Sequence, residues 1–251
     1  MRAVLAGRLA PPDALAHDEA LVRAGAAEPT LLLWRTDPAV IVGRFQRVDW
    51  ETDPAACAAR SVSVWRRFTG GGTVYLDPGV ICAALATPAG HPWAALGVPD
   101  LYAPLLDAVV AACRRCGIAA ERDERTVRVG GRKISGVAAH RGPRGSLVHA
   151  TVLATADLGA LAACIAGPHG GDLAGRPRPA PSRPDTVANV GDADLEGALV
   201  DALDAAPGVL TEAERACAAA LRRERYDLRD WHAGPWHDVM VPSALAVLGG
   251  R

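Results

Sequence analysis

The feature that most constrains the fold is a succession of short apolar runs, separated by turns that contain glycine and proline. Three of these runs, at residues 125–129, 134–141 and 146–155, are joined only by short turns that contain a Gly-Gly pair and a Gly-Pro pair. Such short connections join antiparallel neighbours, because a parallel neighbour needs a long crossover. We therefore expect three consecutive antiparallel strands in the middle of the chain.

Earlier runs predict two more strand pairs. Residues 30–34 and 39–43 flank a Thr-Asp-Pro turn and predict a hairpin. Residues 73–76 and 80–87 flank an Asp-Pro-Gly turn and predict a second strand pair. The alternating pattern at residues 61–65 predicts a further strand, which leads into a run of three glycines.

Helical patterns flank these strands. Residues 13–25 have the pattern of an amphipathic helix, for which Asp13 is the expected N-cap after two prolines. Other helices are expected after Asp53-Pro54, at residues 99–115, from residue 157 onward, at residues 194–205 and at residues 211–225. The predicted fold class is α+β, with a mixed, mostly antiparallel sheet flanked by helices.

The domain organisation is predicted to be simple. The chain has 251 residues, of which half are hydrophobic, and no repeat or low-complexity linker divides it. We expect one domain over residues 1–251. The Gly/Pro/Arg-rich segment at residues 167–184 is too long for a routine connection and predicts a mobile loop or one that a ligand orders.

Charge and hydropathy exclude several classes of partner. The formal net charge is −1, so no basic excess favours a nucleic acid or an anionic membrane surface. No apolar run approaches the roughly 20 residues of a membrane-spanning helix. The N-terminal apolar stretch is too short and too interrupted for a signal peptide. We therefore expect a soluble, cytoplasmic protein.

The cysteines do not indicate a metal or redox centre. Most of the six lie in alanine-rich stretches, where cysteine behaves as a small apolar residue. Cys113 and Cys116 form a single CxxC pair, which is weak evidence for zinc without a second pair. Its helical spacing favours the end of a helix.

Three residues occur once each in the chain. Lys133 is the one lysine among 27 basic residues, Gln46 the one glutamine and Asn189 the one asparagine. A coding bias that replaces Lys, Gln and Asn wherever replacement is harmless would leave them where the substitute fails. Arginine keeps the charge of lysine but presents a wide planar fork in place of a compact ammonium. Lys133 is therefore a candidate functional residue before any motif is considered.

Two glycine-containing segments are the candidate chemical motifs. In the first, Trp-Arg-Arg-Phe-Thr-Gly-Gly-Gly-Thr-Val-Tyr at residues 65–75, the glycines let the backbone approach an anion. Arg66 and Arg67 add forks that suit phosphate or carboxylate oxygens. In the second, Gly-Gly-Arg-Lys-Ile-Ser-Gly at residues 130–136, the entry to a strand brings Lys133 toward a ligand. Ordinary turns with solvated basic side chains are the alternative interpretation of both segments.

Taken in this order, the segments resemble the lipoate–protein ligase family of the biotin/lipoate ligase superfamily. The resemblance covers most of residues 10–205, and the three residues that occur once fall where the family has that residue type. It runs through Leu-Leu-Leu-Trp-Arg at 31–35, Val-Ile-Val-Gly-Arg-Phe-Gln at 40–46, the two glycine segments, Arg141, His149, and Val-Ala-Asn-Val at 187–190. The tail at residues 226–231 also resembles the end of the family's catalytic domains, and residues 206–251 are expected to form a helical tail.

The resemblance implies a two-step reaction. A carboxylic acid such as lipoate attacks the α-phosphate of ATP to give an acyl-adenylate, and a lysine of a lipoyl-domain protein then takes the acyl group as an amide. The resemblance implies Mg²⁺ only as the complex with ATP, with no metal-ligand motif in the sequence. The small C-terminal accessory domain of many ligases has no counterpart here, which implies a separate accessory subunit or another acyl acceptor.

The family's site residues carry over as follows. Lys133 would contact the acid carboxylate and the bridging phosphate, and would offset negative charge in the transition state. The nucleotide would be held by Lys133, Arg67, Gly72, Thr73, Val74 and Tyr75. The acyl substrate would be held by Lys133, Arg67, Gly70, Gly71, Gly72, Arg141 and His149.

The sequence departs from the family pattern around the acyl pocket and the metal side of the nucleotide. The family's His-Asp is Leu76-Asp77 here, its Gly-Asn is Gly79-Val80, and its His-His-Gly is Val148-His149-Ala150. The family's Asn-Asp upstream of the lysine becomes Arg125-Thr126 or, in a shifted register, Asp123-Glu124. These changes leave the identity of the acid open.

Two alternatives therefore stay open. An octanoyl or lipoyl transferase would hold the acyl group as a thioester on Cys164 or Cys116, although both cysteines are expected to be buried and structural. A non-catalytic subunit that binds a lipoyl or adenylate ligand is the second alternative. Biotin ligation is disfavoured because the glycine- and arginine-rich signature of a biotin pocket is absent.

Overall fold

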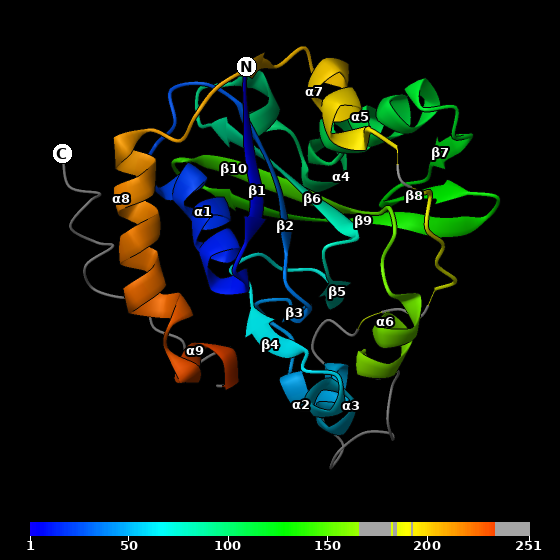
Figure 1. Cartoon of the computed structure of the whole chain (residues 1–251). Helices are drawn as coiled ribbons and strands as arrows, with labels where there is room; N and C mark the ends of the chain where they lie inside the picture. Colours follow the sequence, from blue (N-terminus) through cyan, green and yellow to red (C-terminus); the bar gives the residue numbers. More distant parts are fainter. Residues whose placement is uncertain (166–181, 183–184, 192, 234–251) are drawn as a thin grey trace.

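The structure is a computed structural model that describes residues 1–165, 182, 185–191 and 193–233. In these residues a large sheet of eight strands has the order β11-β1-β2-β6-β10-β9-β8-β7, and a small sheet has the order β4-β3-β5 (Figure 1). The large-sheet strands are β1 (Arg2–Leu9), β2 (Thr30–Thr36), β6 (Val80–Pro88), β7 (Ala120–Arg122), β8 (Thr126–Val129), β9 (Arg132–Gly142), β10 (Gly145–Leu153) and β11 (Ala206–Pro207). The small-sheet strands are β3 (Ala39–Val42), β4 (Ser63–Arg66) and β5 (Val74–Leu76).

Most strand pairs of the large sheet are antiparallel, and only β1 pairs in parallel, with β2 and β11. The helices are α1 (Pro11–Arg23), α2 (Val48–Glu51), α3 (Pro54–Ala59), η1 (Pro92–Ala95), α4 (Val98–Leu101), α5 (Ala103–Arg115), α6 (Leu158–Cys164), α7 (Leu195–Ala202), α8 (Glu212–Leu221), η3 (Arg222–Tyr226) and α9 (Arg229–Ala233). This arrangement confirms the predicted α+β class.

Helices cover both faces of the large sheet, and each face has its own core. Alternate residues of a strand point to opposite faces. Leu31 and Leu33 accordingly pack in the core beneath α5 and α7, whereas Leu32 and Trp34 pack in the core beneath α1 and α8. Figure 1 shows α1 beside α8 and α5 beside α7.

The three consecutive antiparallel strands predicted from the glycine turns are present as β8, β9 and β10. Thr126 of β8 pairs with Gly136 of β9, and Gly136 pairs in turn with Thr151 of β10. The CxxC pair ends α5, as expected, with Cys116 at the C-cap.

The two predicted hairpins are wrong. After β2 the chain leaves the large sheet, so β3 pairs with β4 and β5 rather than with β2. In the same way β6 lies between β2 and β10 and does not pair with β5. A turn motif fixes only a change of direction, and β3 is buried along its whole length, so its pattern does not reveal a partner. The N-terminal strand β1 was not predicted.

Two helix boundaries also differ from the prediction. Helix α1 begins at Pro11 with Ala10 as its N-cap, and Asp13 lies in the first turn instead. Proline suits the first turn because its missing N–H has no acceptor there in any case. The helix expected at residues 99–115 is divided at Tyr102 into α4 and α5.

Part of the predicted loop and tail lies outside the described residues. Of residues 167–184 the structure describes Ser182 alone, and the tail is described as far as Ala233. Among the described helices, none has both the length and the apolar character needed to cross a membrane.

Candidate functional site

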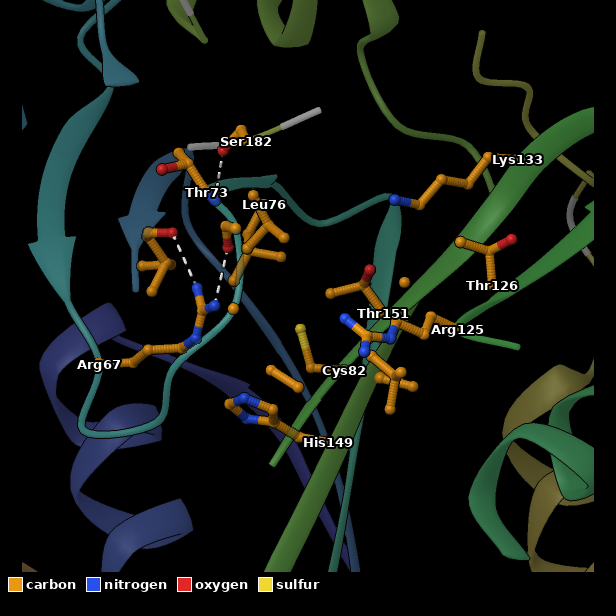
Figure 2. A pocket seen from close by; sticks show the side chains of 18 of the residues that line it. Arg67, Thr73, Leu76, Cys82, Arg125, Thr126, Lys133, His149, Thr151 and Ser182 are labelled. Carbon is orange, nitrogen blue, oxygen red and sulfur yellow. Dashed lines mark hydrogen bonds between the residues drawn. The ribbon is translucent and has the colours of Figure 1, made fainter. Parts of the chain in front are cut away.

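A cavity of about 680 Å³ lies between the large sheet, the small sheet and the glycine-rich loop (Figure 2). Its floor is a row of paired residues that crosses five strands: Trp34, Cys82, Thr151, Gly136 and Thr126. Because paired residues on neighbouring strands share a face, the register alone places this row in one surface.

The glycine-rich loop after β4 packs backbone against backbone. Gly71 has a φ of +82°, and a Cβ there would stand 2.9 Å from the Cβ of Ala138 on β9. A Cβ on Gly43 would stand 2.2 Å from the carbonyl oxygen of Gly71. The loop therefore needs glycine at position 71 for its left-handed turn, and the segment after β3 needs glycine at position 43, where the loop approaches it closely.

Arg67 is buried and organises this loop from inside. Its guanidinium donates to the carbonyl oxygens of Ile41 at 3.1 Å, Gly70 at 2.5 Å and Gly72 at 2.7 Å. Its Nε donates to the Thr69 hydroxyl at 2.9 Å. Burial lowers the pKa of Arg67 to about 10, which leaves it cationic at neutral pH. Its charge thus lies at the edge of the cavity, spread over loop carbonyls.

Gln46 ties the segment after β3 to the C-terminal end of the glycine-rich loop. Its Oε1 accepts hydrogen bonds from the Gly43 N–H at 2.8 Å and the Thr73 hydroxyl at 2.9 Å. Its Nε2 donates to the Ser182 hydroxyl at 3.1 Å, and that hydroxyl also accepts from the Thr73 N–H. The side chain uses both functions of an amide, which explains why a charged substitute would not serve.

Asn189 has a similar role elsewhere. Its Nδ2 donates to the carbonyl oxygen of Ala156 at 2.9 Å, and its Oδ1 accepts from the N–H of the same residue at 3.1 Å. The amide thus pairs with a backbone residue as a strand neighbour would.

Arg66 does not face the cavity, so its predicted role as a cationic fork for phosphate is wrong. The side chain is 1% exposed and donates to five backbone carbonyls. These carbonyls belong to Gly43, Arg44, Gln46, Trp231 and His232. Successive strand residues point to opposite sides, so only one of the two arginines could reach the cavity.

Lys133 enters the cavity from the start of β9. Its stem crosses Gly136, and Nζ lies 3.2 Å from where a Cβ of that glycine would stand. Within the described residues the ammonium has no hydrogen bond or ion pair. Burial lowers the pKa of Lys133 despite the nearby carboxylate of Asp185. An unpaired, partly desolvated cation of this kind attracts an anionic ligand.

His149 lies in the middle of a chain of hydrogen bonds that runs from the buried carboxylate of Asp18 to Arg67. Asp18 accepts from the Trp34 indole at 2.9 Å and lies 3.1 Å from Nδ1 of His149. Nε2 of His149 lies 2.8 Å from the Thr69 hydroxyl, which accepts from Nε of Arg67. Every group is satisfied if neutral His149 carries its proton on Nδ1 and Thr69 donates to Nε2. The chain connects the cavity wall to the glycine-rich loop.

The structure brings most of the predicted site residues to this cavity. Lys133, Arg67, Gly71, Gly72, Thr73, Val74 and His149 line it. Gly70 instead lies beside Phe45, and the Tyr75 side chain packs in a separate core with Cys57 and Cys164. Arg141 is exposed and does not line the cavity.

Sequence reasoning missed several lining residues, among them Asp18 and Cys82. Asp18 could have been found, because it lies between Leu15 and Leu21 on the apolar face of α1. Cys82 carried no such signal, because its strand is buried along nearly its whole length.

The two cysteines proposed for a transferase lie away from the cavity. Cys164 is fully buried behind the small sheet, and the thiol of Cys116 lies 3.8 Å from the carbonyl oxygen of Asp194. The thiol that does line the cavity belongs to Cys82, and burial raises its pKa. In the described part of the chain, no group of three or more His, Cys, Asp or Glu side chains could hold a metal ion.

Residues 10–200 match the model of the lipoyl protein ligase A/B catalytic domain. Lipoate-protein ligase A subunit 1 of Thermoplasma acidophilum is 28% identical over 245 residues, which is 88% of this chain and 91% of that protein. Octanoyltransferase LipM of Moorella thermoacetica is 30% identical over 165 residues, which is 56% of this chain and 60% of that protein.

Solved structures of lipoate protein ligases are similar to this chain in fold. A chain of the archaeal bi-partite lipoate protein ligase, solved with its E2 lipoyl domain from Thermoplasma acidophilum, has a TM-score of 0.79 and 27% identity. The match covers 96% of this chain and 100% of that one. A lipoate-protein ligase A with bound ATP has a TM-score of 0.78 and 26% identity, over 93% of this chain and 98% of that one.

Proposed function

The chain belongs to the lipoyl protein ligase A/B catalytic domain family, and from that membership we propose that it activates lipoate or a similar acid with ATP. The acid carboxylate attacks the α-phosphorus, pyrophosphate leaves, and an acyl-adenylate forms. A lysine amine of a lipoyl-domain protein then takes the acyl group and releases AMP. The cytoplasmic location expected from the sequence is part of this proposal.

The observation that carries the proposal is the ammonium of Lys133, which has no partner among the described residues and lies in the same cavity as the glycine-rich loop. A carboxylate and a triphosphate repel each other, so their reaction needs a cation at the point where they meet. A preorganised positive charge also stabilises the negative charge that accumulates on the phosphorus oxygens in the transition state. Lys133 meets both needs and is the proposed catalytic residue.

The cavity lining includes groups that suit each of the two substrates. Gly72, Thr73 and Val74 supply backbone to the cavity that Lys133 enters, and we assign the nucleotide to them, with Tyr75 contributing its backbone only. Leu15, Trp34, Ile41, Leu76 and Cys82 supply an apolar wall for the acyl chain. His149, Gly71 and Gly72 also line the cavity, while the acyl roles of Gly70 and Arg141 stay predictions of the resemblance.

We propose that Mg²⁺ enters as the complex with ATP, since it prefers phosphate oxygens and keeps several of its waters. The carboxylate of Asp77 is not assigned to the metal ion, because both of its oxygens accept backbone hydrogen bonds. Its oxygens accept from the N–H groups of Gly79 and Asp157, each at 2.7 Å.

The proposed acceptor is a lipoyl-domain protein, with a separate accessory subunit as a second partner. The relative named as subunit 1 and the bi-partite ligase solved with its E2 lipoyl domain support both partners. A non-catalytic subunit that binds the adenylate remains an alternative to this assignment.

A transferase is the second candidate function, and the likeness to an octanoyltransferase favours it. It would need a thiolate in the cavity to hold the acyl group as a thioester. Cys82 has the position, but burial raises the pKa of its thiol, which disfavours the thiolate.

ATP–pyrophosphate exchange with lipoate, octanoate and biotin tests the proposal. We expect exchange with lipoate or octanoate in the wild-type protein, and none in Lys133→Ala at an unchanged melting temperature. No exchange with any acid, together with a stable acyl adduct formed without ATP, would move the transferase to first place. Absence of both products would favour the binding subunit.

A further inference from the structure

The turn between β7 and β8 aims Arg125 at the cavity. Asp123 accepts from the N–H groups of Arg125 at 3.1 Å and Thr126 at 2.9 Å. It also accepts from the Thr126 hydroxyl at 2.7 Å and from Nε of Arg128 at 3.0 Å. Burial would raise the pKa of Asp123, but these hydrogen bonds lower it to about 2. The carboxylate therefore holds the turn in place throughout the neutral pH range.

The acids on this wall are already paired with Arg128. The guanidinium of Arg128 donates to both oxygens of Asp185, at 3.0 and 2.7 Å, as well as to Asp123. A bidentate pair of this kind satisfies both partners. The other acid that lines the cavity, Asp18, is occupied by Trp34 and His149.

Two cations of the cavity then remain without a partner among the described residues: the ammonium of Lys133 and the guanidinium of Arg125. Figure 2 shows both side chains reaching into the cavity, Lys133 from β9 and Arg125 from the residue before β8. Thr126, which follows Arg125, pairs with Gly136 of β9, so the two cations start from neighbouring segments of the sheet. Two unpaired positive charges at one wall favour a ligand with more than one negative charge.

We propose that Arg125 binds the phosphate oxygens of the nucleotide. When the bond between the α-phosphorus and the oxygen that bridges it to the β-phosphate breaks, Arg125 binds the oxygens of the departing pyrophosphate. This inference rests on the proposed function. A single carboxylate is matched by Lys133 alone, whereas a triphosphate offers several anionic oxygens. The guanidinium fork can pair with two of them at once, while the ammonium of Lys133 acts as a point charge. Arg125 thus binds the leaving group, and Lys133 acts where the acid and the α-phosphate meet.

Calorimetric titration with ATP, inorganic pyrophosphate and octanoate tests whether Arg125 binds the phosphates or the acid. The proteins are the wild type, Arg125→Ala, Arg125→Lys and Arg132→Ala. Arg132 is the matched control, because it neighbours Lys133 and is exposed, as Arg125 is, but lies outside the cavity lining. Melting temperatures verify that each variant is folded.

We expect Arg125→Ala to weaken ATP and pyrophosphate binding by roughly 10-fold or more, as the loss of a charge-assisted hydrogen bond does. Octanoate affinity should stay within about twofold, and Arg125→Lys should recover only part of the loss. Unchanged phosphate binding in Arg125→Ala, an equal loss in Arg132→Ala, or a loss confined to octanoate would each overturn the inference. A wild-type protein that binds neither ATP nor pyrophosphate would overturn the proposed function as well.

Discussion

The side chain of Lys133 lies across Gly136, so that a Cβ on the glycine would stand 3.1 Å from Cε and 3.2 Å from Nζ of the lysine. The glycine therefore sets the height of the ammonium above the floor of the cavity. Gly136→Ala should displace the ammonium by a few tenths of an ångström or more. We expect adenylate formation to fall by about 10-fold, because catalysis depends steeply on the placement of a charged group.

The melting temperature of Gly136→Ala should change little, since the flexible end of a lysine can move aside. Gly90→Ala is the matched control, because a Cβ at Gly90 meets nothing within 4 Å and its φ is not in the left-handed region. Full adenylation activity in Gly136→Ala would show that the position of Lys133 above this glycine does not matter.

Lys133→Arg should be nearly as inactive as Lys133→Ala. The guanidinium is wider than the ammonium and would place its charge elsewhere in the cavity. Because burial lowers the pKa of Lys133, the wild-type ammonium loses its proton at a lower pH than an exposed lysine does. The adenylation rate should accordingly fall as the pH rises through that lowered pKa. Wild-type turnover by Lys133→Arg would contradict the catalytic role of Lys133. It would also contradict the inference that the one lysine of the chain was kept because arginine cannot replace it.

Asp18→Asn should destabilise the fold by about 1–3 kcal/mol, the cost of a buried donor left without an acceptor. The carboxylate accepts from Trp34 and from His149, whereas an amide offers only one oxygen. If His149 reversed its tautomer to suit the amide, the Thr69 hydroxyl would lose its acceptor instead. Urea unfolding measures the effect.

The control for Asp18→Asn is Asp37→Asn, which breaks an exposed pair with Arg8. Exposed ion pairs contribute at most about 1 kcal/mol. Equal stability changes in the two variants would contradict the assigned role of Asp18 in the hydrogen-bond chain.

The sequence predicted the parts of the site that depend on residue type along the chain. Lys133 and Gln46 were identified because each residue type occurs once. The structure places Lys133 in the cavity and hydrogen-bonds Gln46 to Thr73 at the end of the glycine-rich loop. The sequence could not predict which of two adjacent arginines faces inward, because that depends on the register of β4 in the small sheet. The strand pairing was also predicted wrongly, because β3 is buried along its whole length and shows no alternation of apolar and polar residues that would reveal its partner.

Arg66→Lys should destabilise the protein by roughly 2–3 kcal/mol, because an ammonium has three donors and the guanidinium makes five hydrogen bonds to carbonyls. These bonds tie the segment from Gly43 to Gln46 to the tail at Trp231 and His232. We also expect Arg66→Lys to lower nucleotide affinity, because Arg66 holds the backbone of Gln46 and Gln46 in turn holds the glycine-rich loop. Arg8→Lys, at an exposed position, is the control for urea unfolding and should match the wild type.

The last prediction separates ligase from transferase. Cys116→Ala and Cys164→Ala, singly or together, should leave acid activation nearly intact, because neither residue lines the cavity. Cys82→Ala is the sharper variant, since its thiol lies on the cavity floor between Trp34 and Thr151. We expect it to alter acid affinity modestly and to leave ATP-dependent adenylate formation in place.

A transferase makes the opposite claim for Cys82, because its acyl group must rest on a thiolate between carriers. Burial raises the pKa of that thiol, so at neutral pH it stays protonated and a poor nucleophile. Mass spectrometry of the protein mixed with octanoyl-carrier protein, without ATP, would reveal a thioester. An adduct that disappears in Cys82→Ala would overturn the ligase assignment. An octanoyl-adenylate that appears only with ATP and Mg²⁺, in wild type and Cys82→Ala alike, would support it.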